Sequence, residues 1–376
     1  PVPGMKNYWV AVGVMAGFCQ GGGVGKCIAE WIIDGEPSID VWAMDVARFG
    51  DYASPQYGTI KSSENYERRF IMTFPNETLP KGRKQKTTAL YDRFVNQGAV
   101  MGDSFGLENV LWFANNKEDA HEEPTIKRSR SHDYVSKEVK NVRENVGLIE
   151  VANFAKHEFK GPDSRKFLNY IMAGRLPKPG RISLTPMLTH KGKLYGDLTV
   201  ACLDEYEFMI FGSGVAQEMH RRWFETHINK FNVNYKNRSD DFHGLSIAGP
   251  KSRKVLEKIV RDDISNEKFK FRDSKKMFAG GVPAIVNRIS FTGELGYEIY
   301  VAPHFQLKLY EELTKAGKEF NIRPFGSRAL MSMRLEKNWG AWTLDYRPDF
   351  TPKETGLDMF INWDKEFIGK DNIKKD

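Results

Sequence analysis

Apolar and polar positions alternate along several stretches between about residues 126 and 300, and a period of two is typical of β-strands with one buried face. Apolar residues at helical spacing occur between these stretches and after them. The predicted strands cover 148–154, 182–188, 194–203, 208–211, 244–248 and 284–289, and the predicted helices cover 164–172, 215–228, 252–260, 305–319 and 327–337. Strands and helices mixed in this way predict an α+β fold.

The first fifty residues show a different pattern. A strand-like run at 8–14 precedes a glycine-rich turn at 21–25, and a helix-like segment follows at 26–33. Glycines at such a turn let backbone amides approach a phosphate at a helix N-terminus, so a dinucleotide contact is physically sensible. An ATP-binding Walker A loop is excluded, because Gln20 stands where its first glycine is required and Cys27 replaces its Ser or Thr. No complete Rossmann domain follows, so this segment supplies only one wall of such a site.

The next stretch, residues 51–125, is polar and irregular, with Pro55, Pro75, Pro80 and the charged run KGRKQK. Prolines and charges in this arrangement are typical of loops. We therefore predict a long connector over 51–125 that wraps the next domain, which we expect to occupy 126–376.

The composition is that of a globular protein with room for two or three domains, since 40% of its 376 residues are hydrophobic. No stretch approaches the run of about twenty apolar residues that a membrane span needs, so we expect no membrane anchor. The first residues, PVPGMKNYWV, lack an initiator methionine and the layout of a signal peptide. We therefore expect the chain to begin inside a longer polypeptide.

The formal net charge of +7 raises the question of a nucleic-acid partner. The basic residues are spread out, with short clusters only at 81–86 and 127–130, and no RNA-binding motif of aromatic and basic residues accompanies them. We therefore expect no nucleic-acid partner. An anionic small molecule such as a polyglutamylated cofactor fits the charge as well.

Cysteines and histidines predict no metal site. Cys19, Cys27 and Cys202 lack metal-type spacing, and we expect reduced, buried thiols in a cytoplasmic protein. The eight histidines contain no HExxH spacing, and no GxSxG motif accompanies them, so hydrolytic chemistry is not supported. We expect His157 and His220 at the surface or at an interface rather than as ligands.

The segment KGKLYGDLTV predicts a hairpin turn that runs into a strand, with Asp197 as a lone carboxylate at the edge of that strand. A carboxylate on an otherwise apolar strand is costly unless it is paired or functional. From the spacing alone, two interpretations of Asp197 are equally supported: it caps the preceding turn, or it is a functional residue.

The segment RISFTGELGYEIY predicts a strand, a Thr-Gly-Glu turn and a returning strand in which Glu298 lies between Tyr297 and Ile299. A carboxylate among aromatic residues can hold a flat heterocycle with an amidine-like edge, because two parallel hydrogen bonds match its two oxygens. The alternative is a position that faces solvent, which is the more common fate of a glutamate in a strand.

Two further features are ambiguous. The helix RALMSMRLEK carries Arg328 and Arg334, which could bind the glutamate carboxylates of a ligand, although a salt bridge within the protein is the default. Phe211 and Gly212 begin the loop FGSG, whose backbone could approach a ligand, and an ordinary turn is equally compatible with this sequence.

Taken together, these segments resemble the glycine-cleavage T-protein family, and the whole chain looks closer to the FAD-dependent dimethylglycine and sarcosine dehydrogenases, which carry such a module. The resemblance implies a T-protein-like folate-binding fold of mixed sheets with packed helices, preceded by the C-terminal end of an FAD-binding oxidoreductase domain over 1–50. The segments that carry it are, in order, PVPGMKNYWVAVGVMAGFCQGGGVGKCIAEWIIDGEPSIDVW, YDRFVNQGAVMGDSFGLENVLWF, IEVANFAKHEF, GKLYGDLTV, SIAGPKSR, ISFTGELGYEIY and RLEKNWGAW.

The resemblance also implies roles for single residues. Asp197 takes the position of the catalytic carboxylate, which would orient folate and assist proton removal as a folate nitrogen attacks an iminium carbon. Glu298 takes the position of the glutamate that binds the pterin ring. Further residues expected at the folate site are Phe291, Ile299, Tyr300, Phe211, Gly212, Arg328 and Arg334. The segment GFCQGGGVG resembles the part that closes over the flavin, and the candidates for partial FAD contact are Gly13, Gly17, Phe18, Gly21 and Gly22.

The sequence departs from the family in two places. The family has an arginine four residues before the Arg of its RLE motif, where this chain has Leu330, so Arg328 is only a candidate for binding the folate tail. The family also continues into a C-terminal β-barrel domain, whereas this chain ends at FIGKDNIKKD. We therefore expect that domain to be missing.

The resemblance implies a folate-dependent oxidative N-demethylase that passes a one-carbon unit from an N-methyl amine to tetrahydrofolate and yields 5,10-methylene-tetrahydrofolate. Its expected partners are the amine, folate and the missing flavin domain, and its cofactors are tetrahydrofolate and, in the full-length enzyme, FAD. Two alternatives stay open: a flavin-independent, tetrahydrofolate-dependent aminomethyltransferase or demethylase in which residues 1–50 are merely structural, and a non-catalytic folate-binding module.

Overall fold

The computed structural model describes residues 1–373, which fold into two compact units. The first unit combines Pro1–Gly50 and Ala155–Asn237 with the chain from Gly340 onward, and the second combines Asp51–Phe154 with Arg238–Trp339. Each unit therefore joins segments that lie far apart in the sequence, unlike the predicted division after residues 50 and 125. Strand pairing is the reason, because one sheet can join distant parts of a chain.

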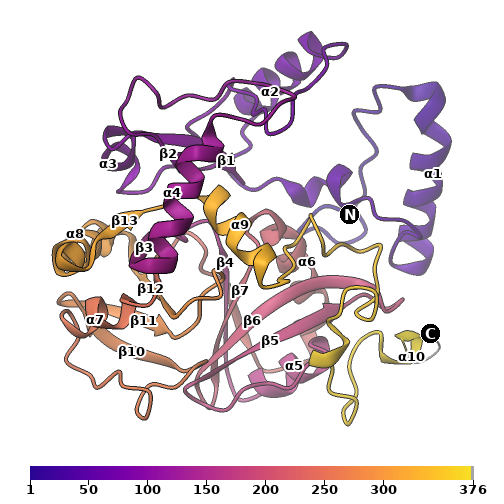
Figure 1. Ribbon diagram of the computed structural model, residues 1–376. Helices are drawn as coiled ribbons and strands as arrows, with labels where there is room; N and C mark the ends of the chain where they lie inside the picture. The colour runs from indigo at the N-terminus through magenta and orange to yellow at the C-terminus, as the bar shows by residue number, and fades with distance from the viewer. Residues whose placement is uncertain (374–376) are drawn as a thin grey trace. The chain divides into compact units, whose positions relative to one another are not determined.

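The first unit is built on a five-stranded sheet in which all neighbouring strands are antiparallel, with the order β5-β6-β7-β4-β8. Figure 1 shows β5 and β6 as long strands side by side. The strands are β4 (Ala155–Lys160), β5 (Arg181–Leu188), β6 (Leu194–Asp204), β7 (Glu207–Gly212) and β8 (Asn234–Asn237). The helices are α1 (Gly17–Asp34), α5 (Ser164–Ile171), α6 (Gln217–His227) and α10 (Lys370–Ile373).

One face of this sheet forms a hydrophobic core with α5 and α6. Leu198, Val200 and Cys202 recur at every second position of β6 and are fully buried. They belong to one cluster with Phe167 of α5 and Phe224 of α6. Because successive side chains of a strand point to opposite faces, the alternate residues Asp197, Thr199 and Ala201 lie on the other face of the sheet.

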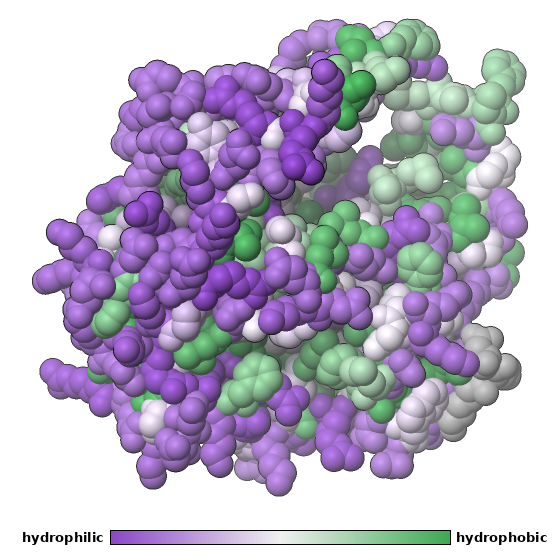
Figure 2. Space-filling view, viewed as in Figure 1, coloured by the Kyte–Doolittle hydropathy of each residue, from purple (hydrophilic) through white to green (hydrophobic). Residues whose placement is uncertain are grey.

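The N-terminal segment differs from its prediction. Residues 8–14 form no strand, and the glycine-rich stretch 21–25 lies inside α1 instead of in a turn before a helix. A strand needs a neighbour for its ladder hydrogen bonds, and 8–14 pairs with no strand in the described part of the chain. Cys27 is the only buried side chain of α1, and Figure 2 shows hydrophobic side chains at the surface where Figure 1 draws this helix.

A buried ion pair anchors the N-terminal segment to α6 within the first unit. The Arg222 guanidinium donates to both carboxyl oxygens of Asp45, with 3.0 Å between Nη1 and Oδ1. It also donates to the backbone oxygen of Pro1 at 2.8 Å and lies over the ring of Trp31. Only 12% of the Arg222 side chain and 4% of the Asp45 side chain are exposed. Removal of either partner would leave a buried charge without compensation.

Replacement of Asp45 by alanine is expected to lower the free energy of unfolding by about 3 kcal/mol, the typical cost of breaking a buried ion pair from one side. Urea denaturation followed by circular dichroism measures this change. The control is Asp34→Ala at the exposed end of α1, which should change stability by less than about 0.5 kcal/mol. Equal, small effects of both substitutions would contradict a stabilising role for the Asp45–Arg222 pair.

The second unit is built on a six-stranded sheet with the order β10-β11-β12-β9-β3-β13, together with the hairpin β1-β2. Its neighbouring strands are antiparallel except β13 and β3, which are parallel. The strands are β1 (Ala99–Ser104), β2 (Leu107–Phe113), β3 (Val146–Glu150), β9 (His243–Ala248), β10 (Ser274–Ala279), β11 (Val282–Asn287), β12 (Gly296–Val301) and β13 (Ile322–Pro324). The helices are α2 (Pro55–Glu67), α3 (Tyr91–Asn96), α4 (Ser131–Glu144), α7 (Ser252–Glu257), α8 (Gln306–Gly317) and α9 (Ser327–Glu336).

The core of the second unit lies between its large sheet and the helices α7 and α8. Tyr297, Ile299 and Val301 recur along β12 and are fully buried. They belong to one cluster with Leu256 of α7 and Leu309 of α8. The alternate residues of β12, including Glu298, therefore point to the opposite face of this sheet.

The hairpin β1-β2, together with α2 and α3, replaces the connector that the composition of 51–125 predicts. Its turn residues, Phe105 and Gly106, both have positive φ angles, at 55° and 75°. Two positive φ angles are typical of a type I′ turn, whose usual sequence signal is Asn-Gly or Asp-Gly. Because an aromatic residue takes this conformation here, that signal is missing from the sequence. A Cβ at Gly106 would lie 2.4 Å from the Tyr52 ring, so no other residue fits there.

Strands and helices predicted from periodicity are otherwise largely present. The predicted strands correspond to β3, β5, β6, β7, β9 and β11, and the predicted helices to α5, α6, α7, α8 and α9. The helix α4 was not predicted, although Val135, Val139 and Val142 recur in it at the helical spacing i, i+4, i+7.

Candidate functional site

Asp197 lies on β6, on the face opposite the core of the first unit, and pairs across the sheet with Pro186 of β5. The residue is partly exposed, yet burial raises the pKa of its carboxyl group to about 7, while a hydrogen bond from its own backbone N–H lowers the pKa slightly. A carboxyl group with this pKa exists in both protonation states near neutral pH. It can therefore accept a proton and return it, as general acid–base chemistry requires.

Phe211 and Gly212 lie at the end of β7 in the same unit. Phe211 pairs directly with Thr199, which is two residues after Asp197, so the structure places Phe211 and Asp197 on the same face of the sheet. Phe211 is 4% exposed. At Gly212 a Cβ would lie 2.7 Å from Leu198 Cδ2, so close packing explains this glycine, and a ligand contact is not needed to explain it.

Glu298 occupies a central strand of the second unit and belongs to a row of polar residues across three strands. Its direct partners are Asn287 of β11 and Ser246 of β9. All three are buried, with exposed fractions of 6%, 0% and 5%. The Tyr300 hydroxyl donates to Glu298 Oε2 at 2.8 Å, and this contact together with burial raises the pKa of Tyr300. The predicted proximity of Glu298 and Tyr300 is therefore present in the structure.

Asn287 belongs to this polar row, and the sequence analysis did not single it out. The Ser274 hydroxyl donates to its Oδ1 at 2.7 Å, whereas its buried Nδ2 has no hydrogen-bond partner among residues 1–373. Buried polar groups normally have partners. The row thus offers a carboxylate acceptor beside an unused amide donor, which fits the edge of a heterocycle that has both donors and acceptors. The available signal was an asparagine inside the apolar run AIVNRI.

Two further residues predicted at the folate site, Ile299 and Phe291, pack against apolar groups of the second unit. Ile299 is fully buried in the core cluster, because alternation along β12 turns it away from the face that carries Glu298. Its side chain is therefore not available to a ligand on that face. Phe291 lies in the segment before β12, where its ring packs against Trp339 with 6.0 Å between the ring centroids.

Arg328 and Arg334 of α9 both bind groups of the second unit. Arg328 Nη1 donates to the Ser131 hydroxyl at 2.7 Å and lies 2.8 Å from Glu122 Oε1. Arg334 is 4% exposed, and its Nη1 donates to the backbone oxygen of Trp339 at 2.6 Å. For Arg328 the structure therefore shows the default arrangement, a salt bridge within the protein.

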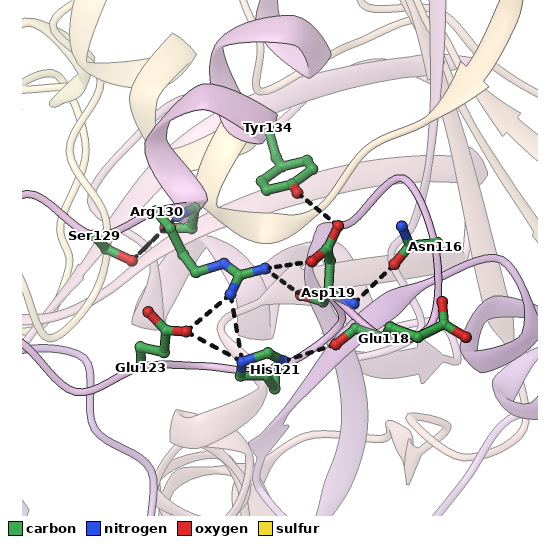
Figure 3. A network of polar contacts seen from close by, with 9 residues as sticks. Asn116, Glu118, Asp119, His121, Glu123, Ser129, Arg130 and Tyr134 are labelled. Atoms are coloured by element: carbon green, nitrogen blue, oxygen red, sulfur yellow. Dashed lines mark hydrogen bonds and ion pairs between the residues drawn. The ribbon is translucent and has the colours of Figure 1, made fainter.

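The basic clusters also have carboxylate partners. Figure 3 shows the Arg130 guanidinium between Asp119 and Glu123, at 2.9 Å and 2.8 Å, with the Tyr134 hydroxyl at 3.3 Å from Asp119. In the other cluster Arg83 donates to Glu108 at 3.0 Å. These carboxylates offset part of the positive charge that a phosphate backbone would need. The absence of a nucleic-acid partner stays a prediction.

His157 and His220 are buried, contrary to their predicted place at the surface or an interface, with exposed fractions of 0% and 1%. Each sits in the aromatic surroundings of Phe224, and burial lowers the pKa of both, to about 4 for His220. Cys19 is exposed, which is also contrary to prediction, whereas Cys27 and Cys202 are buried as predicted. Within residues 1–373, no group of three or more metal-binding side chains is close enough to hold an ion, and no helix is long and apolar enough to cross a bilayer.

The glycines predicted to contact FAD do not form a phosphate-binding turn. Gly17 is the first residue of α1, so Gly21 and Gly22 lie beyond its first turn. Only the first four N–H groups of a helix are free of intrahelical hydrogen bonds, so these two amides are used within the helix. Gly13 has a φ of 69°, which fits a turn, and Phe18 is fully exposed. The backbone amides of Gly21 and Gly22 are therefore not available to a phosphate, contrary to the prediction of a glycine-rich turn there.

Two family models match consecutive parts of the chain. The GCVT N-terminal domain matches residues 90–365, and the FAD dependent oxidoreductase central domain matches residues 34–88. The boundary between the two matched regions, at residues 88–90, lies within the range 51–125 that was predicted as a connector. Both matches agree with the predicted resemblance, which is confirmed.

Two human proteins are similar to this chain over nearly its whole length. Mitochondrial dimethylglycine dehydrogenase is 36% identical over 381 residues, which cover 100% of this chain and 44% of that protein. Mitochondrial sarcosine dehydrogenase is 28% identical, and the match covers 94% of this chain and 43% of that protein. The chain therefore spans less than half the length of these relatives.

A solved structure shows the same fold. The aminomethyltransferase T of the glycine cleavage system from Bartonella henselae superimposes with a TM-score of 0.66 at 22% identity, covering 77% of this chain and 74% of that one. The predicted fold class, mixed sheets with packed helices preceded by a short region of the FAD oxidoreductase type, is confirmed. Since one family model covers 90–365, the chain belongs to the GCVT N-terminal domain family.

Proposed function

We propose that this chain is the folate-binding, one-carbon-transfer part of an oxidative N-demethylase acting on an N-methyl amine of the dimethylglycine or sarcosine type. The observation that carries the proposal is Asp197, a carboxyl group with a pKa of about 7 on the sheet face opposite the α5–α6 core, in a chain of the GCVT family. FAD, held by a flavin domain, would oxidise the amine to an iminium by accepting two electrons as a hydride.

Tetrahydrofolate is the acceptor in this proposal. A folate nitrogen attacks the iminium carbon and forms a carbon–nitrogen bond. The demethylated amine leaves with a proton, the second folate nitrogen bonds to the same carbon and closes the ring, and the proton that this second nitrogen loses goes to water. The product is 5,10-methylene-tetrahydrofolate. Asp197 takes up the proton that the attacking nitrogen loses and returns it to the leaving amine, which is the task of a group titrating near pH 7.

Glu298 and its neighbours bind the pterin in this proposal. The carboxylate accepts hydrogen bonds from the N–H groups of the pterin edge, and the Tyr300 hydroxyl, already donating to Oε2, keeps it in place. The unused Nδ2 of Asn287 donates to an acceptor atom of the same ring. Arg328 and Arg334 are weaker candidates, because a folate tail would have to compete with Glu122 or Trp339 for them.

The experiment that tests folate binding is titration calorimetry of 5-formyl-tetrahydrofolate, an unreactive reduced folate, into this chain. We expect saturable binding with a micromolar Kd, about −8 kcal/mol. No saturable heat, with the protein shown to be folded by circular dichroism, would contradict the proposal.

A flavin-independent aminomethyltransferase is the second candidate, and the arrangement of α1 favours it. Gly21 and Gly22 lie inside this helix and do not offer amides to a phosphate. The absorption spectrum of the full-length gene product separates the two candidates. A flavin spectrum that is bleached by the N-methyl amine supports the demethylase, whereas turnover without any flavin supports the second candidate.

A further inference from the structure

Tyr195 is the extra residue of a β-bulge in β6, two positions before Asp197. Across the β5-β6 ladder Met187 pairs with Gly196 and Leu188 pairs with Leu194, so Tyr195 has no partner on β5. Bulges insert one residue into a strand and change which residues point to which face, and they are frequent next to active sites.

This bulge decides the direction of the Asp197 side chain. Leu194 is fully buried in a cluster with Leu188, and Leu198 is fully buried in the sheet core with Met187. Met187 and Leu188 are consecutive and point to opposite faces, so Leu194 and Leu198 do as well. In a regular strand, residues four positions apart have side chains on the same face, so Leu194 and Leu198 would share a face. If β6 had no bulge and Leu194 kept its present place, the side chain of Asp197 would point into the sheet core.

The helix α6 holds the bulge residue by three side chains. His220 Nε2 lies 2.9 Å from the backbone oxygen of Tyr195. The Tyr195 ring packs on Trp223 with 4.6 Å between centroids, and Arg222 hydrogen-bonds its hydroxyl. Of these contacts, the one from His220 alone reaches the backbone that carries the bulge.

The geometry defines the protonation of His220. A carbonyl oxygen only accepts, so Nε2 must donate, and in the neutral ring Nδ1 then carries a lone pair. This Nδ1 is buried and has no partner among the described residues. The ring lies against the backbone at Gly196, where a Cβ would come within 3.0 Å of Nε2, and at Gly212, where it would come within 3.5 Å of Nδ1. Glycines at these positions on β6 and β7 leave room for the ring.

We propose that His220 is a positioning residue for Asp197: its hydrogen bond to the Tyr195 carbonyl holds the β6 bulge and so keeps the Asp197 carboxyl on the sheet face opposite the α5–α6 core. This role rests on the proposed function of Asp197. His220 touches neither folate nor amine in this proposal, and its effect on one-carbon transfer passes entirely through Asp197.

The test is a double-mutant cycle in the full-length gene product, measuring kcat for 5,10-methylene-tetrahydrofolate formation. His220→Phe keeps the ring but removes the donor, and it should lower kcat about 10- to 100-fold through misplacement of Asp197. In an Asp197→Asn background the same substitution should cause no further loss, because both act through one group. Losses that multiply would overturn the proposal, and so would an unchanged kcat in the single variant.

Two further variants separate positioning from stability. His220→Gln retains an N–H donor at the same distance along the side chain and should restore most of kcat; a loss equal to that of His220→Phe would overturn the proposal. His157→Phe is the matched control, because His157 is as deeply buried and its ring centroid is 6.2 Å from that of His220. It should lower the melting temperature and leave kcat unchanged, whereas a kcat loss equal to that of His220→Phe would overturn the proposal.

Should His220→Phe fail to fold, Gly196→Ala takes its place in the cycle, since the added Cβ presses on the same ring nitrogen. Its loss of kcat must also vanish in the Asp197→Asn background, or the proposal fails. Binding of 5-formyl-tetrahydrofolate is measured in each protein. Wild-type protein that binds no folate would refute the proposed function. Normal folate binding, together with kcat losses that multiply in the double variant, would refute only the role of His220.

Discussion

Glu298→Ala is expected to weaken the binding of 5-formyl-tetrahydrofolate by at least about 100-fold, because hydrogen bonds to a charged partner contribute about 1.5–3 kcal/mol each and two would be lost. Glu298 is 6% exposed, so the bonds would form away from competing water. Titration calorimetry of the wild-type and variant chains measures the ratio of their Kd values. Tyr300→Phe, which removes the hydroxyl that donates to Oε2, should cause a smaller loss.

Glu138→Gln is the matched control for Glu298. Glu138 is also buried in the second unit, where it accepts hydrogen bonds from the backbone N–H groups of Phe113 at 2.7 Å and Gly326 at 3.0 Å. Burial raises its pKa to about 7. Its substitution should lower thermal stability and leave folate affinity unchanged. If both variants bind folate like the wild-type chain, Glu298 does not bind the pterin.

Asp197→Asn is expected to lower kcat of the full-length gene product by at least about 100-fold, within the range that a general acid–base residue contributes. Folate affinity should stay nearly unchanged, since the proposed proton transfer matters in the transition state and not in binding. In the wild-type protein kcat should rise with pH around a midpoint of about 7, because the carboxylate form accepts the proton. The variant should lack this midpoint. A wild-type pH profile that is flat between pH 5 and 9, or a variant with full kcat, would contradict the role of Asp197.

The same carboxyl group should make stability depend on pH in a definite direction. Its pKa rises from an ordinary 3.8 in the unfolded chain to about 7 in the folded protein. Between these values the folded state binds more protons, so the free energy of unfolding falls as pH rises, and the loss is complete above pH 7. Asparagine is neutral at every pH. Asp197→Asn should therefore raise the melting temperature at pH 8 and change it little near pH 4, and a lower melting temperature at pH 8 would contradict the raised pKa.

Local patterns determined much of this protein. The alternation of apolar residues predicted β5, β6 and β7, because a strand with one buried face repeats every two residues whatever surrounds it. The same alternation marked Asp197 and Glu298 as carboxylates that interrupt apolar strands. Motif order over the chain also predicted the family, which the match over 90–365 confirms.

Other features depended on contacts that no local pattern contains. Residues 8–14 have the composition of a strand, yet they have no neighbour to pair with in the described chain. The Phe105-Gly106 turn lacks the usual hairpin residues because packing against Tyr52 stabilises it. In each case the local sequence lacked the identity of the contacting residue, which lies far away in the sequence or in another element.

The sequence by itself determined the periodic strands and helices, the family and the two carboxylates, because these depend on residue type and spacing. Only the tertiary structure decided what surrounds each carboxylate. Strand register placed Asn287 and Ser246 beside Glu298, and the bulge at Tyr195, held by His220 from α6, turned Asp197 out of the core. Register and burial are set by residues far away in the chain, so a local pattern cannot specify them.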